Sequence, residues 1–381
     1  MSLEARLTTL LDVALDSGVA SAAAAVVVVD GTVAARSVRG TVATVDDDGA
    51  PIPAEGRTPV ADGALFDLAS VTKTYSAYTL LRVVESGVLG LDDPIAEHLP
   101  EYRDDPDRRS VTLRHLLTHT SGLPATWPGW RAPFEQALAA LPDGAPPFRA
   151  SPLPDRAPLR TDLARTTLTA PPGRHWEYAC TGFNTAMLVA EAATGESWAD
   201  LVSRETLVPL GLADTLYRPA DAGRRDDVVS TEYQPELHRG VVRGDVHDES
   251  SWSLGGAAAN AGLFADVDDV ARFGEVIRRG ETEVTARWMW DDQLPAVTGR
   301  ADPRGDGTGA SLGLRVGETS WMGAPGGGSR GHTGFTGTSV QVDRDAGLTI
   351  VLLTNRVHPT RHGSGTTDLR RAVAELAFAC R

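Results

Sequence analysis

The chain has 381 residues, of which 41% are hydrophobic, and its formal net charge is −15 at pH 7. The apolar content is sufficient for a packed core and excludes global disorder, and the length fits two to three domains or one large two-lobed domain. The acidic charge disfavours nucleic acid or an anionic membrane as the main partner, because both attract basic surfaces.

The N-terminal region shows no obvious targeting segment. Acidic residues such as Glu4 and Asp12 precede the first apolar run, whereas a signal peptide begins with basic residues. That run, Val19–Val29, is shorter than the roughly 20 residues that a membrane-spanning helix requires. The two cysteines, Cys180 and Cys380, cannot form a disulfide framework and are expected to be free thiols in a reducing compartment. We therefore expect a cytoplasmic protein that does not enter a membrane.

The first part of the chain predicts a helix, a strand pair and a second helix. Leucines recur at helical spacing near the N-terminus, and a β-branched run followed by Asp-Gly is typical of a hairpin. The expected elements are a helix over Leu3–Ser17, strands over Val19–Val29 and Thr32–Val38, a polar loop over Asp46–Gly63 and a helical stretch from Ser70 to Gly87.

The remainder of the chain predicts helices in the middle and a second strand pair near the C-terminus. Proline and glycine punctuate the helical segments, and two β-branched runs flank a turn around Asp345–Gly347. The expected elements are a short helix over Leu113–Thr118 capped by Thr112, a Pro-rich ordered excursion over Pro124–Pro172, a helix over Gly182–Thr194, strands over Ser339–Asp343 and Leu348–Thr354, and a last helix over Thr367–Ala379.

Strands at both ends with helices between them predict one α+β unit of two lobes. Each apolar strand pair must bury a face, and the terminal helices can cover one of these faces. We expect residues 1–66 and 310–381 to form an antiparallel sheet built from both termini and flanked by helices. Residues 67–309 are expected to form an inserted, mainly helical lobe with the active-site loops.

One basic residue stands apart from the others. Of the 36 basic residues, 35 are arginine and one is a lysine, Lys73, which lies three positions after Ser70 on the same helical face. That face continues as Ala77, Leu80, Leu81 and Val84, so it predicts burial of Lys73 and a lowered pKa for its amine. Such an amine can accept the proton of Ser70 when the serine attacks a carbonyl, whereas arginine cannot. The plain alternative is a solvated helix lysine.

Several other patterns compete for a functional role. The segment Gly327–Gly331 matches the Gly-x-Ser-x-Gly elbow of α/β-hydrolases, but that elbow needs a strand before it and a helix after it, so a flexible loop is favoured. His115 and His119 have metal-ligand spacing without an evident third ligand, so packing and loop hydrogen bonds are favoured. The motif His247-Asp248-Glu249 suggests a metal site or, preferably, a structural loop near a cleft. We expect neither a metal nor a cofactor.

Aromatic residues and one cysteine leave two further alternatives. Cys180 is either a nucleophile or a buried thiol beside Tyr178, and the second reading is favoured. Trp127, Trp130 and Trp176 either line an apolar acyl pocket or pack in the core, and the sequence does not separate these roles.

A series of motifs follows the Ser-x-x-Lys of Ser70 and Lys73 along nearly the whole chain. These segments are Leu113–Pro124, Gly173–Cys180, Val246–Glu249, Ala261–Phe264 and Gly331–Gly337. In content and in order, the motifs resemble those of the serine β-lactamase, penicillin-binding protein and family VIII esterase superfamily, on the side of the class C enzymes.

The resemblance implies a role for each matching residue. Ser70 is the expected acylated nucleophile, Lys73 its proton partner, and Tyr178 the tyrosine that shares the proton or relays it to the leaving group. Lys73, as a cation, is also a candidate to stabilise a tyrosinate at Tyr178. The strand motif Lys-Thr-Gly corresponds to His332, Thr333 and Gly334, and the backbone N–H groups of Ser70 and Phe335 are the expected oxyanion donors.

Two departures from the family pattern bear on the substrate. Cys180 stands where the family usually has an asparagine that binds a substrate amide, and His332 replaces the strand lysine that often binds a carboxylate. Both changes favour esters, or small D-amino amides, over β-lactams. We expect a serine hydrolase for a small-molecule ester, lactam or amide, with carboxylesterase activity favoured. The alternatives are a β-lactamase or D-stereospecific peptidase of the DD-peptidase type and a non-hydrolysing penicillin-binding or sensor module.

Overall fold

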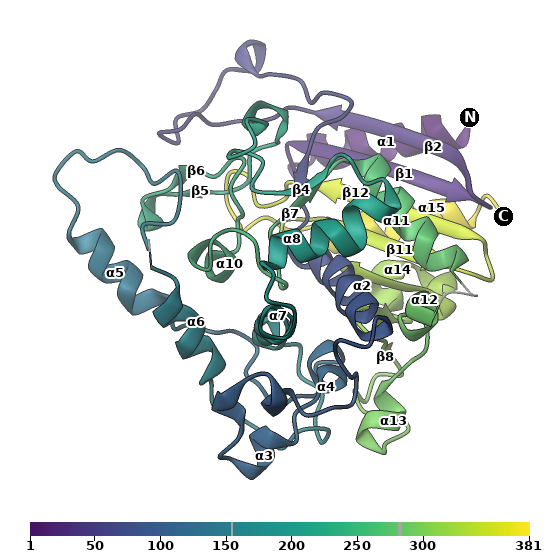
Figure 1. Cartoon of the computed structure of the whole chain (residues 1–381). Helices are drawn as coiled ribbons and strands as arrows, with labels where there is room; N and C mark the ends of the chain where they lie inside the picture. The colour runs from purple at the N-terminus through teal and green to yellow at the C-terminus, as the bar shows by residue number, and fades with distance from the viewer. Residues whose placement is uncertain (154, 281–283) are drawn as a thin grey trace.

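The N-terminal strand pairs with the C-terminal strand in the interior of a large sheet (Figure 1). The computed structural model describes residues 1–153, 155–280 and 284–381. Over these residues, seven strands form one antiparallel sheet in the order β2-β1-β12-β11-β10-β9-β8, which confirms the α+β prediction of a sheet built from both termini. Its strands are β1 Ala22–Val29, β2 Thr32–Gly40, β8 Gly309–Ala310, β9 Arg315–Val316, β10 Arg330–Thr333, β11 Ser339–Asp343 and β12 Leu348–Thr354.

Both faces of strand β1 are buried, which explains its uninterrupted apolar sequence. Alternate side chains point to opposite faces of a strand. Ala23, Ala25 and Val27 therefore pack in one core with α1 (Leu3–Asp16) and α15 (Thr366–Phe378). Their neighbours Ala24, Val26 and Val28 belong to the second, larger core. That core continues into the helical lobe, so the sheet and the lobe form one packed unit.

The helical lobe is arranged around α2 (Thr72–Glu85), which is buried almost all round between Thr72 and Leu81. The prediction of a single inward face on this helix was therefore too narrow. The other helices are α3 Pro106–Arg109, α4 Leu113–Leu117, α5 Arg131–Ala139, α6 Ala157–Ala164, α7 Cys180–Thr194, α8 Trp198–Val202, α9 Val208–Leu210, α10 Glu249–Ser253, α11 Val267–Arg279, α12 Val284–Trp288, α13 Leu294–Thr298 and α14 Thr319–Met322.

Short strands in the helical lobe were not predicted. Three of them form a second sheet, β3-β7-β4, over Phe66–Asp67, Leu263–Ala265 and Thr215–Tyr217. Two others, β5 (Tyr233–Gln234) and β6 (Gly240–Val241), form a two-stranded ribbon. Strands of two or three residues are too short to show the alternation from which strands are predicted. The second sheet matters for function because β3 leads directly into the segment that holds Ser70.

The Pro-rich excursion contains two helices, α5 and α6, which lie at the side of the molecule away from the large sheet (Figure 1). The other predicted helices and strands are present within a few residues of their expected bounds. None of the described helices is long and apolar enough to cross a membrane.

Candidate active site

Ser70 lies in a tight turn and not in the helix proper. The chain leaves β3 and passes through a 3-10 turn, Ala69–Val71, before α2 begins. Ala69 adopts a left-handed conformation (φ 46°), which is unusual for a residue with a side chain. The carboxylate of Asp67 holds this turn by accepting a hydrogen bond of 2.8 Å from the Ala69 N–H. This strained turn therefore sets the direction in which the Ser70 side chain points.

Lys73 is fully buried and donates three hydrogen bonds. Its Nζ lies 3.0 Å from Ser70 Oγ, 3.3 Å from Cys180 Sγ and 2.9 Å from the carbonyl oxygen of Asn260. An ammonium group has three N–H donors and no acceptor, so this environment satisfies it completely. A neutral amine would have only two hydrogens for three acceptors. The geometry therefore favours the charged form of Lys73.

The expected lowering of the Lys73 pKa is wrong in its net direction. Burial alone lowers this pKa, but the side chains of Cys180 and Tyr178, with a smaller contribution from Asp248, raise it by more. The pKa of Lys73 is therefore higher than that of an ordinary lysine. The sequence predicted the burial of Lys73 but not its hydrogen-bond acceptors Cys180 and Asn260. These lie 107 and 187 residues further along the chain. Lys73 is a cation at neutral pH, and its second predicted role, as a charge beside Tyr178, fits this state.

Tyr178 is surrounded by two cations and two neutral histidines. Lys73 Nζ lies 5.1 Å and Arg315 Cζ 4.9 Å from the centre of its ring. The rings of His119 and His332 lie 4.6 and 5.9 Å from it, centre to centre. Burial, together with the charges of Lys73 and Arg315, holds the pKa of both histidines well below the usual range. The charged groups that face the Tyr178 ring from these neighbours are therefore the two cations.

The strand motif lies on β10 beside the turn that holds Ser70. His332 is buried and Thr333 half-buried, and both Thr333 and Gly334 line the same cavity as Ser70. Phe335 follows with its side chain 48% exposed and its ring stacked on that of His247 at 5.7 Å. The structure therefore places the strand motif beside the predicted nucleophile.

Two threonines fasten this loop to the nucleophile turn. Thr336 Oγ1 donates a hydrogen bond of 2.7 Å to the carbonyl of Asp67, and Thr338 Oγ1 one of 2.8 Å to that of Leu68. Both bonds are buried and bridge about 270 positions of sequence. The backbone of Phe335 is therefore held in a defined position relative to Ser70, as a pair of oxyanion donors requires.

Gly334 has no room for a side chain. A Cβ at this position would meet Thr338 Oγ1 and would lie 2.5 Å from the carbonyl oxygen of Leu68, inside van der Waals contact. We predict that Gly334→Ala separates the loop from the nucleophile turn and lowers kcat/KM for an ester about 100-fold, the size of effect seen when one oxyanion donor is lost. Steady-state kinetics with p-nitrophenyl butyrate measure this effect. Gly63→Ala is the control, because that exposed glycine has no positive φ and no atom lies within 4 Å of its Cβ position; equal activity of both variants contradicts the prediction.

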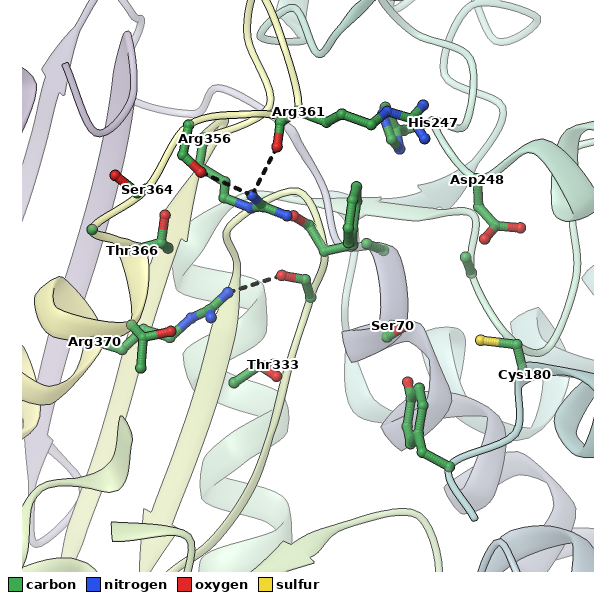
Figure 2. A pocket seen from close by; sticks show the side chains of 18 of the residues that line it. Ser70, Cys180, His247, Asp248, Thr333, Arg356, Arg361, Ser364, Thr366 and Arg370 are labelled. Carbon is green, nitrogen blue, oxygen red and sulfur yellow. Dashed lines mark hydrogen bonds between the residues drawn. The ribbon is translucent and has the colours of Figure 1, made fainter. Parts of the chain in front are cut away.

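A cavity of about 740 Å³ joins these residues. Figure 2 shows Ser70, Cys180 and Asp248 on one side and Ser364, Thr366 and Arg370 on the other, with Thr333 between them. Tyr178 and Arg315 also line it. Its volume suits a small molecule. Of the predicted site residues, those that line it are Ser70, Tyr178, Cys180, Thr333, Gly334 and Phe335, whereas Lys73 and His332 lie behind them.

The motif His247-Asp248-Glu249 forms a loop at the edge of this cavity, as favoured from the sequence. Asp248 accepts a hydrogen bond from Ser251 N and caps α10. His247 Nε2 lies 2.9 Å from a carboxylate oxygen of Glu232, which also pairs with Arg361. No group of three or more potential metal-binding side chains is found in the described part of the chain.

The other residues that competed for a functional role make structural contacts. Ser329 is fully buried and donates to Asp343 Oδ2 at 2.8 Å, and it stands before a strand and not before a helix, so it does not form a nucleophile elbow. His115 completes the capping box of α4, and His119 Nδ1 accepts a hydrogen bond of 3.0 Å from Ala179 N. Cys180 is half-buried and not fully buried as expected, because its thiol reaches the cavity.

The structure favours a packing role over an acyl-pocket role for the three tryptophans. Trp127 and Trp130 are buried in the larger hydrophobic core. Trp176 lies under the guanidinium of Arg304, 4.2 Å from ring centre to Cζ. The described residues that line the cavity include none of them, so the acyl-pocket reading is not supported.

Two residues of the site were missed from the sequence. Asn260 contributes its backbone carbonyl to Lys73, and its side-chain amide donates to Asp248 at 3.1 Å. Arg315 lies on a strand of two residues, and in a chain with 35 arginines nothing marked it. Asn260 directly precedes the segment Ala261–Phe264, so proximity to a matching motif was the one available signal.

Comparisons with known proteins bear on the family of the chain. A family model described as Beta-lactamase matches residues 7–375. Esterase EstB of Burkholderia gladioli is 32% identical, and the alignment covers 98% of this chain and 95% of the esterase. A protein named "Putative D-alanyl-D-alanine carboxypeptidase" from Escherichia coli K12 is 28% identical over 78% of this chain and 70% of its own length.

A solved structure supports the fold. EstCE1, described as a hydrolase with promiscuous acyltransferase activity, superposes with a TM-score of 0.71 at 22% identity, covering 99% of this chain and 98% of EstCE1. The fold and the Ser-x-x-Lys site define a serine hydrolase of the β-lactamase/transpeptidase-like type. The chain belongs to the β-lactamase family.

Proposed function

We propose that the protein hydrolyses small carboxylic esters through an acyl-enzyme on Ser70. The observation that carries this proposal is the hydrogen bond of 3.0 Å from Lys73 Nζ to Ser70 Oγ at the wall of the cavity. The identity to esterase EstB over nearly the full length of both chains supports the choice of esters.

In the proposed reaction Ser70 Oγ attacks the ester carbonyl carbon, and its proton passes to the oxygen of Tyr178. The N–H groups of Ser70 and Phe335 bind the oxyanion of the tetrahedral intermediate. The bond to the leaving alcohol then breaks, and the alcohol takes the proton from Tyr178. Water attacks the acyl-enzyme in the reverse sense and releases the acid. Lys73 remains an ammonium ion throughout and orients Ser70, while its charge stabilises the phenolate form of Tyr178.

Two features favour esters over β-lactams or peptides. Cys180 presents a thiol at the position where an asparagine side chain would bind the amide group of a substrate. Lys73 Nζ donates a hydrogen bond of 3.3 Å to its sulfur. His332 is buried and neutral, so it brings no charge toward a substrate carboxylate. Turnover of p-nitrophenyl butyrate, nitrocefin and a D-alanyl amide under one set of conditions tests this proposal. Ester turnover should dominate, and turnover of nitrocefin or the amide at a higher kcat/KM overturns it.

A DD-peptidase-like activity is the second candidate, favoured by the relative named as a carboxypeptidase. Cys180→Asn tests the boundary between the two. We predict that this variant raises amide turnover relative to ester turnover about tenfold, because an asparagine amide hydrogen-bonds a substrate amide and a thiol does so only weakly. The ratio of kcat/KM for the D-alanyl amide and the ester measures this shift. Cys180→Ser is the matched control, and a ratio that rises equally in both variants contradicts the prediction.

The division of the chain into a sheet lobe of residues 1–66 and 310–381 and a helical lobe of residues 67–309 is retained as a proposal. The strands of the large sheet fall within or one residue outside the first set, which supports it.

A further inference from the structure

The strand motif of this chain has no positive charge to offer. His332 Nδ1 lies 2.8 Å from the carbonyl oxygen of Thr333, so this nitrogen carries the hydrogen and donates it. Nε2 is then a bare acceptor, and it is buried without a partner among the residues that the structure describes. Burial and the nearby Arg315 and Lys73 hold the pKa of His332 well below the usual range. The histidine is therefore uncharged at neutral pH.

The adjacent strand brings a cation to the same place. Arg315 lies on β9 directly opposite Gly331, the residue before His332 on β10. Its guanidinium lies 4.9 Å from the centre of the Tyr178 ring and lines the cavity. Lys73 lies at a similar distance, 5.1 Å, from the same ring. Two cations from different elements, β9 and α2, therefore converge on one phenol.

Arg315 is held in this position by a buried carboxylate. Glu318 accepts hydrogen bonds of 3.0 and 3.3 Å from Arg315 Nη1, and its side chain is only 7% exposed. The same carboxylate pairs with Arg304 at 2.7 Å and accepts a bond of 2.8 Å from Trp321 Nε1. The shared carboxylate therefore restrains the guanidinium of Arg315 from one side, because Glu318 is itself held by Arg304 and Trp321.

We propose that Arg315 is a catalytic residue that supplies the positive charge missing from the strand motif and stabilises negative charge on Tyr178 during proton transfer from Ser70. Glu318 is its positioning residue. The inference rests on the proposed function, since it assigns a role in the same reaction. It also explains why the strand motif can carry an uncharged histidine at position 332. The positive charge comes from Arg315 on the neighbouring strand.

The charges around Tyr178 are few enough for a decisive pH experiment. Lys73 faces it from α2, Arg315 from β9, His119 from the loop after α4 and His332 from β10. The Cys180 thiol and the Asp248 carboxylate act on it through Lys73. Glu318 and Arg304 lie behind Arg315 and partly offset one another. Removing Arg315 therefore leaves Lys73 as the main positive charge at the ring.

The test compares variants of Arg315 by the pH dependence of kcat/KM with p-nitrophenyl butyrate, an uncharged ester. In Arg315→Met we expect kcat/KM at neutral pH to fall about 100-fold and the acid limb of the profile to move up by about one pH unit or more, because a nearby cation favours the charged phenolate. Arg315→Lys should keep most of the activity. Adding His332→Lys to Arg315→Met should restore at least tenfold, and Glu318→Gln should lower kcat/KM, because Arg315 loses the carboxylate that holds it.

Two controls keep this inference separate from the proposed function. Arg330→Met removes an arginine that lies 4.7 Å over Trp290 and is absent from the cavity lining described for the structure, so its profile should match the native one. Melting temperatures exclude misfolding. If Ser70→Ala is inactive and Arg315→Met gives the native profile, the role of Arg315 is overturned and the serine mechanism stands. A loss of activity in Arg315→Met with an unmoved acid limb also overturns it, since a structural role predicts that result.

Discussion

Ser70→Ala should lose esterase activity by a factor of about ten thousand or more, because removing a nucleophile abolishes the covalent route and leaves only binding and oxyanion stabilisation. The fold should be unaffected, since Ser70 lies at the cavity wall and its hydroxyl receives one hydrogen bond, from Lys73. The measurement is kcat/KM for p-nitrophenyl butyrate, together with the melting temperature.

Ser86→Ala provides the matched control for this variant. Ser86 is the C-cap of the same helix and is exposed, and its hydroxyl donates to the carbonyl of Val83. Its activity should equal that of the native enzyme. Residual activity of Ser70→Ala within tenfold of Ser86→Ala would place the nucleophile elsewhere.

Lys73→Met should lower kcat/KM about a thousandfold. The change removes the donor that orients Ser70 and one of the two cations beside Tyr178, and loss of one preorganised donor costs about a hundredfold to a thousandfold. It also leaves the sulfur of Cys180 and the carbonyl of Asn260 without their donor. The same ester assay measures the effect, and activity within tenfold of native contradicts it.

Lys73→Arg separates charge from geometry. The variant keeps a cation, but a planar guanidinium cannot direct three hydrogen bonds to the three acceptors that surround the ammonium. We expect activity between that of Lys73→Met and that of the native enzyme. Because the pKa of Lys73 is raised, its charge is present throughout the neutral range and is lost only as the pH rises through that higher value. An acid limb in the native profile therefore reports a group other than Lys73.

Part of this site was predictable from local sequence. The spacing of Ser70 and Lys73 and the apolar residues that follow them predicted burial of the lysine, and β-branched runs beside turns predicted the strands β1, β2, β11 and β12. These features depend on neighbours within a few residues. The C-terminal pair β11 and β12 has the bounds expected from its two β-branched runs.

The remaining features depend on contacts that local pattern does not encode. The charge state of Lys73 is decided by Cys180 and Asn260, which come from distant segments. Arg315 reaches Tyr178 because β9 pairs with β10, and a two-residue strand leaves no periodic signal. The left-handed conformation of Ala69 could not be predicted from the sequence either, since alanine rarely adopts it.

Labelling with a fluorophosphonate, followed by intact-mass and peptide mass spectrometry, tests the central claim most directly. The native protein at neutral pH should gain one adduct on the peptide that contains Ser70, and Ser70→Ala should gain none. The absence of an adduct on the native protein would favour a non-hydrolysing binding module. An adduct on Ser329 or Cys180, retained in Ser70→Ala, would contradict the assignment of Ser70 as the nucleophile.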